Sequence, residues 1–515
     1  MNNRMSRRDT LKIIGASALP VLFPRQVNAV SNWLQPEQKK NNILIVVLDT
    51  LSANHLSLYG YKRPTSSSME RFASRATVYH SHYSGGNFTT TGTASMLTGL
   101  YPWSHRALQI RGLMKRSRTA ENLFHQVGSE YHKMVFTQNM LAELLLNQFH
   151  EDINDHLPFT LSTLSSKDIL LPRGFRNDPN LSFYAYGDFL TIRQNNDGPL
   201  AGSSILGLLD VWKKAEEEPV LEEYPFGAPT NSYYTYSNTD TFSAIVKEVE
   251  RASEQDKPFF GYFHLWTPHE PYLPRKEFAG MYKEDSYEPA QKPEHNLNDT
   301  HRPQKNLDRL RRTYDEYITD VDNDLGMFLD ALESKGILDN TYVIITSDHG
   351  QLFERGQHGH VTTLMFDSLL HIPLLISAPG QTQRRDVYAP TSNVDILPTL
   401  VALAGQVADT NTEGRLLPGL GGVEDLDRSI YSVVARTNSA FAPITTASIA
   451  LIKGSKKLVY YMGYGSYDKV SELYDLADDP EELVNLATDD RATAARMRDE
   501  LLNSLDESNR ANQGA

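Results

Sequence analysis

The sequence predicts an α/β protein in which helices flank a largely parallel central sheet, followed by a smaller C-terminal α+β unit. Four apolar runs, at 43–48, 259–264, 342–346 and 372–377, are typical of strands that are buried on both faces. Helical patterns lie between these runs. Strands that alternate with helices indicate a layered sheet whose strands are mostly parallel.

The clearest helical pattern lies between the second and third of these runs. Its apolar residues recur every three or four positions, which places them on one face of a helix. Gly336 then provides a typical helix stop. The residues of this face are Leu307, Leu310, Tyr314, Ile318, Val321, Leu325, Phe328 and Leu332.

Composition changes along the chain predict its domain organisation. Residues 30–408 form the expected large N-terminal domain, with an irregular insertion at about 150–245. The insertion includes the tyrosine-rich segment 224–236, which we expect to be an exposed loop or a rim over the site. A glycine-rich, acidic connector at 409–428 leads to a C-terminal subdomain at 429–515.

The C-terminal subdomain shows two element patterns of its own. The run KLVYY at 457–461 is typical of a strand, and a charged helix begins at about Asp490. These patterns are the basis for expecting a separate α+β unit.

Residues 1–29 carry the features of a twin-arginine export signal in the required order. Arg7 and Arg8 precede a short apolar run at 13–23, and residues 27–29 provide a cleavage site. We therefore expect export by the twin-arginine machinery to the periplasm or the medium. The apolar run is shorter than the roughly 20 residues that span a bilayer, so we expect no stable membrane anchor.

The composition is that of a soluble globular protein, with 40% hydrophobic and 22% charged residues. Its formal net charge of −14 argues against a nucleic-acid partner, because phosphate contacts need clustered Lys and Arg. The chain contains no cysteine, so disulfides contribute nothing to its stability.

Two carboxylates and an imidazole follow strands of the predicted sheet. Asp49 ends the first strand, and Asp348 and His349 follow the strand at 342–346. Ligands collect at the carboxyl ends of such strands. Oxygen and nitrogen donors together suit Mn or Zn better than Ca or Mg, so we predict a divalent metal site, with Mn or Zn favoured.

A polar segment from Asn87 to Thr93 precedes the apolar run at 94–97 and is predicted to be a turn that caps a helix. A helix N-terminus also presents backbone N–H groups to an anion, so the segment can bind an anionic ester near Asn87. A threonine hydroxyl here would be a nucleophile only if a base or a metal ion activated it.

Four histidines are further candidates. His264 and His269 follow the strand at 259–264, and His358 and His360 lie shortly after Asp348. Histidine can protonate a leaving oxygen near neutral pH or bind an anionic oxygen. We predict catalytic roles for His269 and His358, and weaker substrate-binding roles for His264 and His360.

Several segments, in order, resemble the sulfatase family of the alkaline-phosphatase superfamily. The opening strand and Asp49 resemble the family's first metal motif, and 94–102 (ASMLTGLYP) resembles the segment after its nucleophile. Residues 347–350 (SDHG) resemble the second metal motif, and 394–400 and 472–476 resemble later signatures. The resemblance implies an alkaline-phosphatase-like fold, a divalent metal ion and hydrolysis of an ester.

The nucleophile position departs from the family pattern. Counting back from Gly99 places Thr89 where a sulfatase has the cysteine that becomes formylglycine, and the resemblance therefore implies Thr89 as nucleophile and metal ligand. Gln138 and Asn139 replace the lysine and histidine that bind sulfate in sulfatases, and His349 replaces an asparagine that many sulfatases have. These residues resemble the threonine-nucleophile enzymes of the superfamily.

The sequence thus predicts an exported, metal-dependent hydrolase of anionic esters, with phosphate mono- or diesters favoured. The sulfate ester of a formylglycine hydrate can expel sulfate by collapsing to an aldehyde. A sulfate ester of threonine cannot do this and must await attack by water, which favours phosphate esters for a threonine nucleophile. A sulfatase, a phospho-group transferase and a non-catalytic binding protein remain alternatives. The expected substrate is a small-molecule, glycan or lipid ester.

Overall fold

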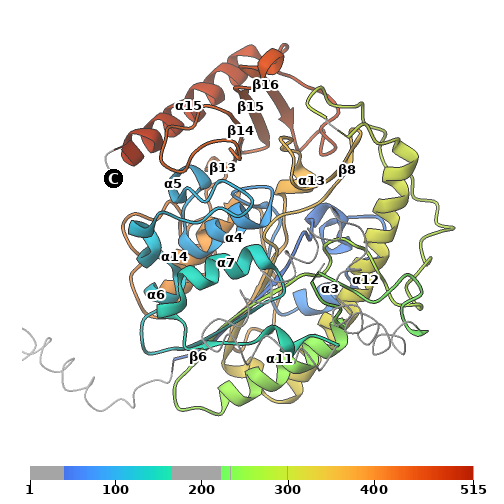
Figure 1. Ribbon diagram of the computed structural model, residues 1–515, viewed down its shortest axis with the longest axis vertical. Helices are drawn as coiled ribbons and strands as arrows, with labels where there is room; N and C mark the ends of the chain where they lie inside the picture. Colours follow the sequence, from blue (N-terminus) through green and yellow to red (C-terminus); the bar gives the residue numbers. More distant parts are fainter. Residues whose placement is uncertain (1–39, 165–221, 232, 299, 514–515) are drawn as a thin grey trace, which may run out of the picture. The chain divides into compact units, whose positions relative to one another are not determined.

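Figure 1 shows the computed structural model, which describes residues 40–164, 222–231, 233–298 and 300–513. The predicted export signal lies outside the described residues, as does most of the predicted insertion. Contacts group Asn41–Ala515 into one unit. Among the described residues, none of the helices combines the length and apolarity that a membrane span needs.

An eight-stranded sheet forms the centre of this unit, with the strand order β11-β2-β10-β7-β1-β6-β4-β5. Every neighbouring pair is parallel except the two that β10 makes, with β7 and β2. The prediction of a largely parallel sheet is therefore confirmed. The strands are β1 Asn42–Leu48, β2 Thr77–Tyr79, β4 His132–Thr137, β5 Asp155–His156, β6 Phe259–Leu265, β7 Thr341–Thr346, β10 Leu374–Ser377 and β11 Arg385–Val387.

Helices cover both faces of this sheet, and the alternation of side chains along β1 shows how. Leu44, Val46 and Leu48 pack in one apolar cluster, with residues of the helices α3, α11 and α12. Ile43 and Val47 face the opposite cluster, with residues of α4, α6, α7 and α14. Figure 1 shows the two groups of helices on opposite sides of the sheet. A strand buried on both faces explains the continuous apolar run in the sequence.

The flanking helices differ widely in length. On the first face lie α3 Ser67–Ala73, α11 Asn238–Ser253 and α12 Gln304–Ser334. On the second lie α4 Thr89–Thr98, α6 Leu123–Gln126, α7 Met140–Gln148 and α14 Ile396–Leu403. Lys335 is the C-cap of α12, and Gly336 follows with a φ of 69°, so the predicted stop is confirmed.

The C-terminal part is an antiparallel sheet of four strands with one long helix. The strands are β13 Ser429–Val434, β14 Ala447–Lys453, β15 Lys456–Met462 and β16 Val470–Asp475, and the helix is α15 Arg491–Gln513. The strand predicted at 457–461 and the helix predicted from about Asp490 are both present. The domain boundary at 409–428 stays a prediction, because this sheet and the large one belong to the same unit.

Two short α-helices and two small sheets are the remaining α-helices and strands of the described part, which also contains several short 3-10 helices. The α-helices are α5 Pro102–His105 and α13 Asp367–Leu370, and the sheets are β3 His82–Tyr83 with β12 Thr391–Ser392 and β8 Leu352–Glu354 with β9 Gln357–Gly359.

The tyrosines of segment 224–236 that were expected to be exposed are mostly buried, whereas the alternative of a rim over the site stays a prediction. Tyr224, Tyr234 and Tyr236 are all at most 2% exposed. The hydroxyl of Tyr236 lies 3.4 Å from that of Tyr317 on α12, so the ring is buried and its polar end still has a partner. These tyrosines are therefore packed in the interior near α12, while Phe226 of the same segment is 63% exposed.

Candidate functional site

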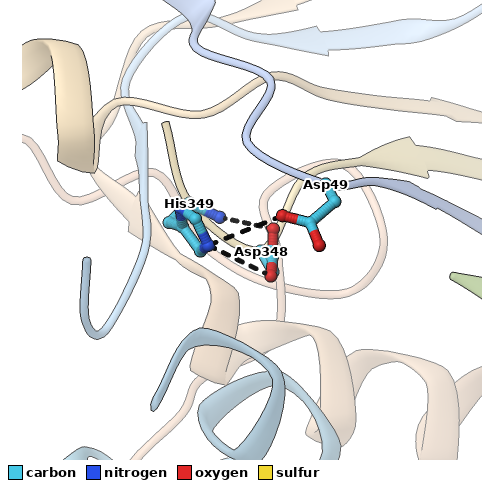
Figure 2. A group of neighbouring side chains, drawn as sticks. All are labelled: Asp49, Asp348 and His349. Carbon is cyan, nitrogen blue, oxygen red and sulfur yellow. Dashed lines mark hydrogen bonds and ion pairs between the residues drawn. The ribbon is translucent and has the colours of Figure 1, made fainter. Parts of the chain in front are cut away.

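The candidate site lies at the carboxyl ends of β1 and β7, which are adjacent and parallel with Val47 opposite Thr346. This register brings Asp49 to the same edge of the sheet as Asp348 and His349. One ligand atom from each of these three residues lies within 4.8 Å of the others, and all three side chains are fully buried. Figure 2 shows both carboxylates and the imidazole turned toward one another. The structure thus brings together three of the four predicted metal ligands at one point.

Backbone hydrogen bonds orient Asp348. Its Oδ1 accepts from the N–H of Thr50 at 3.3 Å and from the N–H of His349 at 2.9 Å. Its Oδ2 has no hydrogen-bond partner among the described residues. Because Oδ1 is held by the backbone, Oδ2 is the atom left to bind a ligand.

Thr50 holds the turn after β1 in an uncommon conformation. Its φ is 62°, a left-handed value that is unfavourable for a β-branched residue. The N–H of Thr50 donates to Asp348, and its carbonyl accepts from the hydroxyl of Tyr314 at 2.6 Å. These bonds offset the strain of the turn and fix the direction of Asp49. Such strain at the edge of a site is a common feature of functional turns.

The atoms around this point suit a cation. Asp49 Oδ1, Asp348 Oδ2 and His264 Nε2 are buried without a hydrogen-bond partner among the described residues. His264 Nε2 lies 3.7 Å from Oδ2 of Asp49 and 3.7 Å from Oδ2 of Asp348, and His349 Nε2 lies 3.4 Å from the latter atom. Ligand atoms that share an ion at about 2.1 Å lie roughly 3–3.5 Å apart, so these imidazole–carboxylate separations are close to those of shared ligands.

Electrostatics also favours a cation here. Burial, followed by the charge of the neighbouring Asp49, raises the pKa of Asp348. Two buried carboxylates that face each other repel, and a divalent ion would neutralise both. His264, predicted only as a weak substrate contact, faces both carboxylates and therefore joins this donor set.

Thr89 begins α4 and does not lie in a turn before it, in contrast to the expectation for 87–93. Phe88 is the N-cap, and Thr89 is the first helical residue. The helix can start close to the loop that carries Asp348 and His349 because Gly92 has no side chain. A Cβ at Gly92 would lie 2.2 Å from the carbonyl oxygen of Asp348. The first turn of α4 thus presents its free N–H groups and the Thr89 hydroxyl at the edge of the sheet.

Asn139 lies at the site, although the sequence analysis identified it only as a replacement for a sulfate-binding residue of the family. Its Oδ1 accepts from the N–H of Leu141 at 2.7 Å and caps α7, which fixes the orientation of the amide. Its Nδ2 therefore donates to Thr89 Oγ1 at 3.2 Å and to Oδ2 of Asp49. One amide links the candidate nucleophile to a candidate metal ligand.

The ring of His349 is oriented by a backbone carbonyl. Its Nδ1 lies 2.9 Å from the carbonyl oxygen of Gly350 and must donate to it, so the Nε2 of the neutral ring carries a free lone pair. That Nε2 lies 3.4 Å from Thr89 Oγ1. Since Asn139 donates to Thr89, the hydroxyl hydrogen of Thr89 is directed at His349. Thr89 therefore lies within the same ligand cluster as His349.

Three more histidines form the rim of the site. The ring of His360 lies 4.5 Å from that of His349 and 4.9 Å from that of His269, measured between ring centroids. His269 donates from Nδ1 to the carbonyl of Glu270 at 2.7 Å, and this leaves its Nε2 available. His358 Nε2 lies 3.1 Å from the hydroxyl of Tyr272 and 3.4 Å from a carboxylate oxygen of Glu270. Its pKa is lowered, chiefly by burial.

Asn87 is buried, and the N–H groups of its side-chain amide already have acceptors. Its Nδ2 donates to the carbonyls of Thr362 at 3.0 Å and Leu364 at 3.1 Å. Its Oδ1 has no hydrogen-bond partner among the described residues. These bonds tie the loop after His360 to the start of α4 and use both N–H groups of the amide. Because Oδ1 can only accept, Asn87 has no donor left for the oxygens of an anionic ester.

Comparison with known families decides the relationship of this chain. A family model described as Sulfatase matches residues 41–406, which is more than half of the chain. The chain belongs to the sulfatase family. A second family model, described as N-sulphoglucosamine sulphohydrolase, C-terminal, matches residues 356–511. The family predicted from the motifs is therefore confirmed, while the role of Thr89 in place of cysteine stays a prediction.

Individual relatives agree with this family. The choline-sulfatase of Rhizobium meliloti (strain 1021) is 29% identical over 297 residues, which are 51% of this chain and 55% of that protein. The chain thus spans about half the length of that relative. The protein named uncharacterized sulfatase YidJ of Escherichia coli (strain K12) is 24% identical over 507 residues, 91% of this chain and 88% of that protein.

Among solved structures, the phosphonate monoester hydrolase of Agrobacterium radiobacter has a TM-score of 0.63 and 21% identity. The match covers 91% of this chain and 96% of that one. At this identity the likeness shows the fold, and it confirms the predicted alkaline-phosphatase-like architecture.

Proposed function

We propose that this chain is an exported, metal-dependent hydrolase of anionic esters in which Thr89 is the nucleophile. The observation that carries the proposal is the position of the Thr89 hydroxyl, in hydrogen-bond contact with Asn139 and His349. His349 in turn lies in the cluster of unpaired donors around Asp49 and Asp348.

Asp49, Asp348, His349 and Thr89 are the residues that we expect to hold the ion, with His264 as a further donor. Mn or Zn suits this mixture of oxygen and nitrogen ligands better than Ca or Mg. A divalent ion bound here would lower the pKa of the Thr89 hydroxyl and offset the negative charge of the ester oxygens.

The proposed reaction has two steps, and residues of the chain have a role in each. Thr89 Oγ1 gives its proton to solvent and attacks the phosphorus or sulfur atom while the bond to the ester oxygen breaks. His269 gives a proton to the departing alcohol and later regains one from solvent. The N–H groups at the start of α4 stabilise the charge on the transferred group, while the amide of Asn139 orients the Thr89 hydroxyl. His358 and His360 bind its remaining oxygens. Water then cleaves the Thr89 ester and restores the hydroxyl.

Phosphate mono- or diesters are the favoured substrates because of the nucleophile. A formylglycine hydrate can release sulfate by collapsing to an aldehyde, but a threonine ester has to await attack by water. The sulfatase family model, together with the choline-sulfatase relative, supports hydrolysis of sulfate esters as the second candidate. We expect a small-molecule, glycan or lipid alcohol as the organic part.

Substitution of Thr89 tests the proposal. Thr89→Ala should lower kcat by at least about 1,000-fold, because it removes the attacking oxygen, while Thr89→Ser should retain much of the activity. Thr98→Ala is the matched control, since Thr98 ends the same helix and its hydroxyl bonds only the carbonyl of Ala94. An active Thr89→Ala protein would contradict the assignment.

A substrate comparison separates the two candidate chemistries. Metal-free protein is supplied with Mn, Zn, Ca or Mg and assayed on an aryl sulfate, an aryl phosphate monoester and a phosphodiester. The proposal predicts the highest kcat/KM on a phosphate ester with Mn or Zn. A higher kcat/KM on the aryl sulfate would establish the second candidate.

A further inference from the structure

Trp266 lies against the imidazole of His269, the residue that we expect to protonate the departing alcohol. The two ring centroids are 3.9 Å apart, and the ring planes are inclined by 41°. Aromatic pairs in proteins usually have centroids about 4.5–7 Å apart, so these two rings are in direct contact. Among the described residues, the next closest ring pairs are 4.5 Å apart.

One backbone carbonyl binds both rings. His269 Nδ1 donates to the carbonyl of Glu270 at 2.7 Å, and the indole Nε1 of Trp266 donates to the same oxygen at 3.1 Å. A carbonyl oxygen has two lone pairs, so it can accept both bonds. The backbone N–H of His269 also donates to the carbonyl of Trp266 at 2.9 Å, which closes the turn between them. The two rings therefore share an acceptor and a turn as well as a contact surface.

Trp266 is itself held by other segments of the chain. Its backbone N–H donates to Oε1 of Gln138 at 3.0 Å, and Gln138 follows β4 and is 1% exposed. Its side chain packs against a small cluster of the buried residues Phe159, Tyr234 and Tyr236. We call these three residues the aromatic cluster. Because these contacts are made within the protein, the indole is in place before a substrate binds.

The bond at Nδ1 alone leaves the imidazole of His269 free to swing. A ring held at one nitrogen can turn about that hydrogen bond, and Nε2 at its far side then moves the most. Trp266 restricts this motion, together with His360, whose ring centroid lies 4.9 Å from that of His269. The restriction matters because a displacement of about 1 Å at a reacting group can lower the rate about 100-fold.

We propose that Trp266 is a positioning residue for proton transfer, which holds the imidazole of His269 so that Nε2 faces the oxygen of the departing alcohol. This inference rests on the proposed hydrolase function, because it concerns the proton that His269 supplies in the first step. The proton moves from Nε2 to the ester oxygen as the bond from that oxygen to phosphorus or sulfur breaks. Nδ1 keeps its own proton on the Glu270 carbonyl, and solvent later restores the proton on Nε2.

The leaving-group dependence of kcat/KM tests the proposal in the metal-loaded, full-length protein. A para-nitrophenyl ester, whose leaving oxygen needs little protonation, is compared with the phenyl ester of the same anionic group. We expect Trp266→Leu to raise the ratio of nitrophenyl to phenyl kcat/KM about tenfold, because a misplaced imidazole slows mainly the ester that needs the proton. Trp266→Phe keeps an aromatic face against the imidazole and should leave the ratio within about twofold of the wild-type value. An unchanged ratio in Trp266→Leu would overturn the proposal.

The ratio is insensitive to partial unfolding, because the concentration of active protein cancels between the two esters. Phe159→Leu is the matched control, since it removes aromatic volume from the aromatic cluster and leaves the indole of Trp266 against His269. We expect its ratio to equal that of the wild type. A rise as large as that of Trp266→Leu would show that looser packing is sufficient, and the positioning role would then be wrong.

His269→Gln separates the inference from the mechanism on which it rests. This variant lacks the proton donor, so its ratio should rise at least as much as that of Trp266→Leu. A raised ratio in His269→Gln but not in Trp266→Leu would refute the inference and leave the role of His269 intact. A wild-type ratio in His269→Gln would show that His269 is not the donor, and both assignments would fail.

A measurement without turnover tests the contact between the two rings. Histidine is labelled with carbon-13 at Cε1, and the signal of His269 is identified by its absence from His269→Gln. Trp266→Leu should shift this signal, because the ring current of the indole acts on the imidazole, and Phe159→Leu should leave it in place. An unshifted signal in Trp266→Leu would overturn the inference. If no ester is hydrolysed and the signal shifts as expected, the hydrolase proposal fails while the orientation of His269 by Trp266 stands.

Discussion

Asn139 offers the sharpest test of how the site is organised. Asn139→Ser keeps a side chain that can cap α7 at the N–H of Leu141, but its hydroxyl is too short to reach Thr89 or Asp49. The variant thus loses one hydrogen bond to a hydroxyl and one to a carboxylate. Together these are worth about 3 kcal/mol, which corresponds to a loss in kcat on the order of 100-fold if both act in the transition state.

Steady-state assays of the metal-loaded variant measure this loss, and urea denaturation checks the fold. Asn122→Ser is the matched control, because Asn122 caps α6 through the N–H of His125 away from the site. Asn122 also donates to a neutral acceptor, the carbonyl of Thr119, and to the carboxylate of Asp152. We therefore expect the two variants to lose similar stability, at most about 3 kcal/mol, and only Asn139→Ser to lose activity. A kcat for Asn139→Ser within threefold of the wild-type value would refute the role given to Asn139.

Three further predictions concern stability and the approach of α4 to the loop that carries Asp348 and His349. Burial, followed by the charges of His371 and Arg428, lowers the pKa of His82 to about 3, so the folded protein holds this ring neutral. The stability that the neutral ring contributes is present above pH 6.5 and is lost as the pH falls, by about 2 kcal/mol between pH 7 and pH 5. In urea unfolding, the stability of His82→Gln should therefore depend less steeply on pH than that of the wild type. Asp395→Ala should cost about 3–5 kcal/mol in urea unfolding, because it leaves Arg428 buried without the carboxylate that it binds with both Nη atoms; a cost below 1 kcal/mol would contradict this. Gly92→Ala should cost about 1–3 kcal/mol and lower kcat/KM, since its Cβ would collide with the carbonyl of Asp348, whereas wild-type activity would show that α4 can shift freely.

The cluster of Asp49, Asp348 and His349 was predictable from the sequence because strands buried on both faces leave a clear pattern. Asp49 and Asp348 follow continuous apolar runs, and adjacent parallel strands place such residues at one edge of the sheet. The long helix α12 was equally predictable, since its apolar face repeats over many turns and Gly336 ends it.

Features that depend on packing between distant segments were not predictable in this way. The role of Asn139 depends on the direction in which the cap of α7 turns its amide. The interaction of His264 with both carboxylates depends on where β6 ends relative to β1 and β7. Tyr236 was expected to be exposed, and its burial depends on the hydroxyl of Tyr317, 81 residues away. Periodicity and composition report on one segment at a time and carry no signal for such contacts.

The most direct test of the central claim is to find the transferred group on Thr89. Metal-loaded protein is mixed with substrate in a single turnover, quenched in acid at successive times, digested and examined by mass spectrometry. The account predicts that the peptide containing Thr89 gains one phospho or sulfo group before free product appears, and that Thr89→Ala shows no such gain. Product formation with that peptide unmodified at every time point would contradict the claim that Thr89 is the nucleophile.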